Sequence, residues 1–220
     1  MTMSTPARSH FARATAARAA AASTPGQSMA GATPYELMLI KLATDRRALK
    51  GVQSVARKIE LKRKLLPEYD DYVAGVLDAG RGAQDDVLVT VMIWRIDVGD
   101  YEGALAIASY AVEHSLALPD YFERSLASLL AEQFADAALA AFMDDQSFPF
   151  SPLERIDQLT ADADMHDQVR AKLYKALGYA IEQVDASRAL DYLRRAVSLN
   201  DRVGAKKDID RLTKSIETAG

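Results

Sequence analysis

The strongest constraint on the fold comes from one apolar run, which lies between Asp85 and Gly99 and reads DDVLVTVMIWRIDVG. Its β-branched residues would suit a buried strand, but the run is about 14 residues long, whereas strands usually have roughly 4–8. Gly99 stands where a helix C-terminus favours glycine, and Asp85 or Asp86 can cap the N-terminus. The sequence therefore predicts a helix that is buried on nearly all sides, with Trp94 in the core.

A long helix is predicted upstream of this run, from Thr33 to Leu66. It begins with a capping box, in which Thr33 is the N-cap and Glu36 its partner, and Pro67 ends it. Gly51 costs a helix roughly 1 kcal/mol relative to alanine and permits a bend. Alternating steps of three and four residues favour a coiled-coil or helical-hairpin seam; its positions are Leu42, Asp45, Leu49, Val52, Ala56, Ile59, Arg63 and Leu66.

Two later segments resemble each other, DYEGALAIASYAV at 100–112 and DASRALDYLRRAV at 185–197. The shared Asp, Ala-Leu and Ala-Val positions are typical of tetratricopeptide-like helical hairpins, where small residues let helices approach closely. The 85-residue interval between them is not a multiple of the 34-residue tetratricopeptide period, which argues against a regular array. Further helices are expected at 67–80, 119–132, 133–145, 152–161, 166–183 and 205–217.

The predicted fold is therefore all-α, with an N-terminal long helix or helical hairpin followed by a tetratricopeptide-like helical-hairpin body. Lys and Arg concentrate before residue 67, and such a basic segment favours a nucleic-acid partner. We therefore divide the chain into a flexible basic arm (1–32), a basic helical region expected to bind DNA and to oligomerise (33–80), and a helical-repeat-like core expected to bind partners (81–220). The chain has no cysteine, so disulfides and thiolate metal sites are excluded. No apolar run approaches the roughly 20 residues that span a bilayer.

Charge is distributed unevenly along the chain, whose net charge is -4. Residues 1–66 contain 12 Lys and Arg and three acids, a net of +9, and the remaining 154 residues have a net of -13. Such asymmetry favours a nucleic-acid or acidic-partner surface at one end. Two mutually attracted surfaces within one oligomer would produce the same pattern.

The candidate DNA-binding residues all lie before Pro67. The bases of the long helix lie outside its seam, apart from Arg63. Glu60 is the one acid among the bases from Arg57 to Lys64. The alternative interpretation is a plain solvated helix face. The full set is Arg8, Arg13 and Arg18 in the arm, and Arg46, Arg47, Lys50, Arg57, Lys58, Lys62, Arg63 and Lys64 in the long helix.

Acidic pairs raise the possibility of a metal-dependent nuclease, which needs several carboxylates around one or two Mg²⁺ ions. The candidates are Asp85, Asp86, Asp70 and Asp71. Successive positions on a helix point about 100° apart, so neither pair easily chelates one ion. We therefore favour helix caps and first-turn acids, and expect no cofactor and no metal unless the nuclease alternative holds, in which case Mg²⁺ is required. No G-x-x-x-x-G-K-[ST] phosphate loop is present.

Several segments in order along nearly the whole chain resemble a known family, and they include TPARSHFAR, YELMLIKLATDRRALK, GAQDDVLVTVMIWRIDVGDYEGALAIASYAVEHSLALP, TADADMHDQVRAKLYKALGY and LRRAVSLNDRVGAKKDIDRL. The chain resembles the small terminase subunit of peduovirus-type temperate tailed phages, often labelled the terminase endonuclease subunit. Family members carry a Lys/Arg-rich tail past the last helix, whereas this sequence ends at Gly220. The resemblance therefore supports no C-terminal DNA contact.

The resemblance implies a DNA-packaging function in the host cytoplasm. The partners it implies are double-stranded phage DNA near the cohesive-end or packaging site, a large ATPase subunit that cuts and packages, and further copies of the chain, commonly in a ring. The alternatives are a chain that is itself the metal-dependent endonuclease and a helical adaptor that binds only proteins. No membrane partner is expected.

Overall fold

The computed structural model describes residues 5–23, 33–118 and 124–219, and every regular element among them is a helix. The prediction of an all-α fold is therefore confirmed. The chain divides into two compact units, unit 1 (residues 1–122) and unit 2 (residues 123–220). From the sequence we placed divisions after residues 32 and 80. The helices that follow residue 80 pack against those that precede it.

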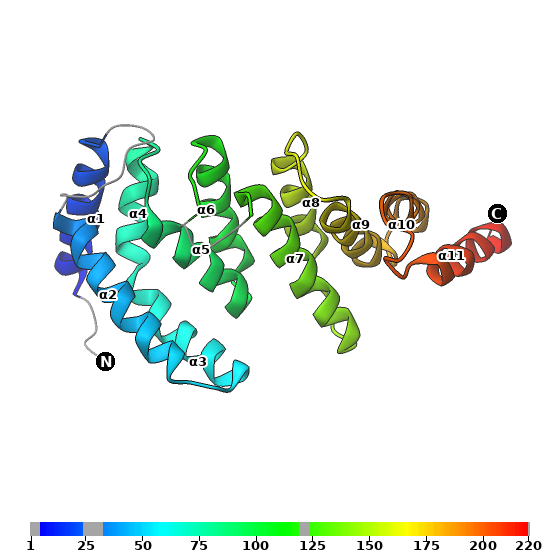
Figure 1. Ribbon diagram of the computed structural model, residues 1–220, viewed down its shortest axis with the longest axis horizontal. Helices are drawn as coiled ribbons and strands as arrows, with labels where there is room; N and C mark the ends of the chain where they lie inside the picture. The colour runs from blue at the N-terminus through cyan, green and yellow to red at the C-terminus, as the bar shows by residue number, and fades with distance from the viewer. Residues whose placement is uncertain (1–4, 24–32, 119–123, 220) are drawn as a thin grey trace. The chain divides into compact units, whose positions relative to one another are not determined.

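Unit 1 contains the helices shown from blue to green in Figure 1. They are α1 (Pro6–Ala21), α2 (Thr33–Lys50), α3 (Val55–Leu65), the short 3-10 helix η1 (Leu66–Glu68), α4 (Asp70–Ala79), α5 (Asp86–Val98) and α6 (Tyr101–Glu113).

Helix α5 is the apolar run that dominates the sequence, and it forms the core of unit 1. The Asp85 side chain caps it by accepting a hydrogen bond from the Leu88 amide at 2.8 Å. Gly99 ends it in the left-handed conformation, with φ 84°. Trp94 is buried and meets the Tyr69 ring edge to face. The predicted caps and the core position of Trp94 are confirmed.

The predicted helix from 33 to 66 is interrupted, so α2 and α3 are separate helices. Gly51 ends the first through amide hydrogen bonds to the carbonyls of Arg47 and Ala48. Ser54 starts the second by accepting a hydrogen bond from the Arg57 amide at 3.4 Å. The seam continues only in part: Leu42, Asp45, Leu49 and Leu66 are buried, whereas Ala56 and Arg63 are exposed.

Residues 6–21 differ from the expected flexible arm, since they form α1, which packs closely along α4 (Figure 1). The approach is close because small residues meet there: Ala16 and Ala20 are buried, and a Cβ on Gly75 would lie 2.4 Å from the Arg13 carbonyl oxygen. Arg13 also donates to Asp78 of α4 at 2.8 Å. Residues 1–4 and 24–32 of the predicted arm lie outside the described residues.

Unit 2 contains five helices among its described residues. They are α7 (Leu126–Met143), α8 (Phe150–Leu159), α9 (Asp167–Ile181), α10 (Ala186–Leu199) and α11 (Lys206–Ala219). The predicted pair 119–132 and 133–145 is one continuous helix from Leu126, because no glycine or proline interrupts it; residues 119–123 lie outside the described part of the chain.

The two similar segments have the same local role in their own units. Asp100 caps α6 and Asp185 caps α10, each accepting from a backbone amide three residues on, at 3.0 and 2.9 Å. Ala104 and Ala189 are both fully buried in contacts with a neighbouring helix. These helices close hairpins as predicted, whereas the tetratricopeptide-like arrangement of the whole body remains a prediction.

Helix α7 is the one helix in the described part of the chain that is long and apolar enough to cross a membrane by length and composition. It also packs on α8 and α9, with Leu130, Phe134 and Ala138 fully buried. It thus supplies the core of unit 2.

We predict that Gly75→Ala loosens α1 from α4, because the added methyl group meets backbone atoms that must move. Such overpacking typically costs about 1–3 kcal/mol. Hydrogen exchange of the amides of residues 6–21 should accelerate roughly 10-fold or more. Gly51→Ala is the control, since its Cβ would make only ordinary contacts. Unchanged protection of α1 in Gly75→Ala would contradict this packing.

Candidate nucleic-acid interface

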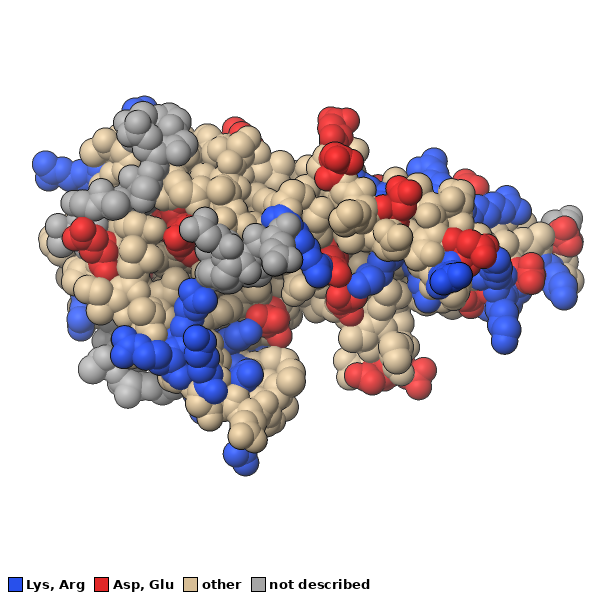
Figure 2. Space-filling view, in the orientation of Figure 1, with Lys and Arg blue, Asp and Glu red and all other residues tan. Residues whose placement is uncertain are grey.

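The basic residues of unit 1 gather where α2 ends and α3 follows. Figure 2 shows Lys and Arg side chains clustered over these two helices, with few acids among them. Eight of the bases predicted from sequence lie between residues 46 and 64, where Glu60 is the one acid. We give the name α3 surface to six of these bases, of which Lys58 is half-buried and the others are exposed: Arg47, Lys50, Arg57, Lys58, Arg63 and Lys64.

Helix α3 has no fully buried side chain, although Ile59, Leu61 and Leu65 are half-buried, and polar contacts also attach it to unit 1. Lys62 forms an ion pair with Asp97 near the C-terminus of α5, where only 17% of the lysine side chain is exposed. Arg63 donates to the carbonyl oxygen of Val98 at 3.3 Å. Bases near a helix C-terminus are favourable because backbone carbonyls there carry partial negative charge. Lys62 therefore has a structural role.

Asp45 is the one acid at a seam position, and it is buried as that position predicts. Its charge has two partners, since Lys41 pairs with it at 2.8 Å and the Tyr69 hydroxyl donates to it at 2.6 Å. Lys41 also pairs with Glu68 at 3.0 Å and lies over the Tyr69 ring. The (i, i+4) spacing of Lys41 and Asp45 was the sequence signal for this pair.

The three arginines of α1 are not equivalent. Arg13 is held by Asp78, although both side chains remain about half exposed (53% and 51%). Arg8 and Arg18 are exposed on the outer face, with Phe11 between them. A polyanion therefore has ready access to Arg8 and Arg18.

The carboxylates at 85 and 86 face different surroundings. Asp85 is fully buried, and its second oxygen accepts from the Tyr72 hydroxyl at 2.6 Å. Burial raises the pKa of Asp85 to about 6, although hydrogen bonds from Tyr72 and Leu88 oppose the shift. Asp86 is part-buried and accepts from the Gln84 amide at 3.2 Å. Asp85 thus caps α5 with both oxygens occupied.

Asp70 and Asp71 begin α4, as predicted, and Asp70 pairs with Arg95 at 2.6 Å. Burial raises the pKa of Asp70, while Arg95 opposes the shift. Within the described ranges, no group of three or more His, Asp or Glu side chains is placed to hold a metal ion. The four suspected acids are thus not assembled into such a cluster.

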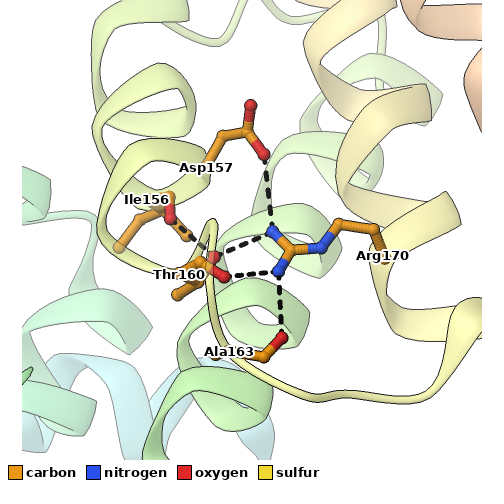
Figure 3. A network of polar contacts seen from close by, with 5 residues as sticks. All are labelled: Ile156, Asp157, Thr160, Ala163 and Arg170. Atoms are coloured by element: carbon orange, nitrogen blue, oxygen red, sulfur yellow. Dashed lines mark hydrogen bonds and ion pairs between the residues drawn. The ribbon is translucent and has the colours of Figure 1, made fainter.

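Asp162 and Asp164 lie in the turn between α8 and α9, which Arg170 organises (Figure 3). The Arg170 guanidinium donates to the Thr160 hydroxyl at 3.0 Å, to the carbonyl oxygens of Thr160 and Ala163, and to Asp157. The guanidinium thereby joins Thr160, the C-cap of α8, to Ala163 in the turn that follows. Asp162 and Asp164 are exposed and take no part in these contacts. The contacts of Arg170 give the turn a structural role.

These features describe an all-α protein in which a group of exposed bases of unit 1 lies on two consecutive helices. The model of the phage small terminase subunit family matches residues 39–168. The chain is 43% identical over 216 residues to the "Terminase, endonuclease subunit" of Escherichia phage P2, covering 98% of this chain and 87% of the relative. It is 26% identical over 192 residues to the "Probable terminase, endonuclease subunit" of Haemophilus phage HP1 (strain HP1c1), covering 80% and 68%.

The chain therefore belongs to the phage small terminase subunit family, which takes part in phage genome packaging. No solved structure matches it.

We predict that Asp85→Asn removes a pH dependence of stability. A folded pKa of about 6 lies above the ordinary 3.8, so the wild-type side chain stabilises the fold most when protonated, below pH 4. That contribution is lost as pH rises through 6. Asparagine is an equally good N-cap, so the stability of Asp85→Asn relative to wild type should increase by about 2.4 kcal/mol between pH 4 and pH 7. Urea unfolding across this range measures the difference, and a constant difference would contradict the assigned titration.

Proposed function

We propose that this chain binds double-stranded phage DNA through the α3 surface and directs its packaging. On this proposal it binds the concatemeric genome near the packaging or cohesive-end site in the host cytoplasm. It assembles with further copies of itself, and it presents the DNA to a large ATPase subunit that cuts and translocates it. The observation that carries the proposal is a group of bases on α2 and α3 that form no ion pair with the described acids of unit 1.

The balance of charge within unit 1 supports this surface. Unit 1 has 14 bases and 14 acids, so it is neutral as a whole. Three of the bases that precede residue 67 are paired with acids of later elements: Arg13 with Asp78, Lys41 with Glu68, and Lys62 with Asp97. The charged groups of Lys50, Arg57, Lys58 and Lys64 form no ion pair or hydrogen bond with the described residues.

The chemistry of the surface fits the phosphate backbone. Contacts from Lys and Arg to phosphates release condensed counterions, and they supply affinity that does not depend on sequence. Such contacts position a protein on a duplex, whereas bases are read by other groups. Helix α3 has no fully buried side chain, and its last turn carries Arg63 and Lys64 beside the paired Lys62. It can therefore contact a duplex without exposing the core of unit 1.

Self-association is supported by apolar side chains that α1–α3 leave exposed. Leu37 and Ile40 are 59% and 65% exposed, and their spacing of three residues puts them on one face of α2. Phe11 and Val55 are exposed as well. Aromatic and aliphatic side chains at a surface favour protein contacts. We therefore assign the first half of α2 to copies of the same chain, with a ring as one closed arrangement.

We assign DNA cleavage and ATP hydrolysis to the large subunit, although both relatives carry the name endonuclease subunit. Asp85 is buried with both oxygens occupied, and Asp70 is paired with Arg95. On this proposal the chain needs no cofactor for its own function. Mg²⁺-dependent nicking by the isolated chain that Asp86→Asn abolishes, without unfolding it, would contradict the assignment.

We predict that replacing Arg57, Lys58 and Lys64 with glutamine weakens DNA binding and its dependence on salt. Each lost phosphate contact should make the slope of log Kobs against log salt concentration shallower by about 0.9, so the three together remove up to about 2.7. Lys62 and Arg63 are kept, because they hold α3 to α5. Fluorescence anisotropy with a labelled duplex at several salt concentrations gives both slopes.

A variant with the same change in net charge serves as the control. Gln146→Glu, Gln158→Glu and Gln183→Glu lie at exposed positions of unit 2 and also lower the net charge by three. We expect this control to retain the wild-type slope. If the α3 variant retains it as well, the α3 surface is not where DNA binds.

A further inference from the structure

We propose that unit 2 carries a second contact for the DNA phosphate backbone, at the opposite end of the sequence from the α3 surface. It is formed by Arg194 of α10, Arg202 in the turn that follows, and Lys207 and Lys214 of α11. We call it the α11 surface. The inference rests on the proposed function, because it adds a second contact on the same polyanion.

The charges of unit 2 are separated along its sequence. Unit 2 has 13 bases and 17 acids, a net charge of -4. Residues 123–187 contain five bases and 12 acids, a net of -7, whereas residues 188–214 contain eight bases and four acids, a net of +4. The chain as a whole is therefore basic at both ends and acidic between them. Summing everything after residue 66 into one acidic total hides this second basic segment.

Half of the bases in residues 188–214 are compensated by acids of unit 2. Arg188 pairs with Glu154, Lys206 with Asp201, and Arg211 with Glu182 and Asp208. Arg195 interacts electrostatically with Asp157. The other four are the members of the α11 surface. All four are exposed, and their charged groups form no ion pair or hydrogen bond with any described residue.

The spacing of three bases of α11 places them on one face of the helix. Lys207, Arg211 and Lys214 follow at steps of four and three residues, so they share one face of α11, opposite the buried Leu212. Seven residues of helix separate the two lysines by about 10 Å along the axis. Figure 2 shows Lys and Arg side chains over α10 and α11, interspersed with acids. The bases thus form a short stripe on an ordered helix, and the exposed Asp210 lies beside them, three residues after Lys207 and four before Lys214.

The composition of this segment favours phosphates over a protein partner. Protein interfaces have an apolar core and are depleted in lysine. The large apolar residues that unit 2 exposes in its described part are Met143 and Val184, and both precede residue 188. Contacts to a DNA backbone need only exposed, uncompensated Lys and Arg. A duplex therefore fits the α11 surface better than an acidic protein does.

The test replaces Arg194, Lys207 and Lys214 with glutamine in the full chain and measures duplex binding across a range of salt concentrations. Loss of three phosphate contacts should make the slope of log Kobs against log salt concentration shallower by up to about 2.7. The charge-matched control is the triple variant Gln146→Glu, Gln158→Glu and Gln183→Glu, which should retain the wild-type slope. Lys207→Arg with Lys214→Arg should also retain it.

The outcomes separate this inference from the proposed function. If the α11 variant has the slope of its control while the α3 variant loses slope, the second contact is wrong and the α3 surface stands. If the α11 variant alone loses slope, the second contact stands and the α3 surface is wrong. If the wild-type chain shows no salt-dependent binding, the proposed function fails and the second contact fails with it.

Discussion

The ion pair between Lys62 and Asp97 is the contact on which the basic surface of unit 1 depends. Helix α3 buries no side chain completely, so hydrophobic packing alone does not hold it. Lys62 and Arg63 fasten it to the C-terminal end of α5, the most buried helix of the unit. Arg57, Lys58 and Lys64 form no ion pair with the described residues, although Glu60 lies on the same helix. These two polar contacts therefore position the helix, while its other bases remain accessible to a polyanion.

Local signals in the sequence predicted much of the helical structure. The caps at Asp85 and Gly99 and the core position of Trp94 follow from residue type and spacing within one helix. The hairpin role of residues 100–112 and 185–197 follows from matched caps and small residues. Such features need no knowledge of the rest of the chain, because each is determined by neighbours within a few residues.

Other features depend on contacts between distant residues and could not be predicted. The α1 segment has a weak apolar pattern, so its docking depends on Gly75, more than fifty residues later. The break at Gly51 was anticipated only as a bend. Pairing across the fold also decides which bases are available: Asp78 and Asp97 neutralise Arg13 and Lys62, which the sequence placed among candidates for DNA. Counting charges along the chain cannot separate paired from unpaired bases.

We propose that duplex DNA lies against α3, and site-specific crosslinking tests this most directly. The chain has no cysteine, so Glu60→Cys on α3 or Gln146→Cys in unit 2 carries a single photoreactive label. The account predicts a covalent adduct with a cohesive-end duplex from position 60 and far less from position 146. Intact DNA binding without an adduct from position 60 would contradict it.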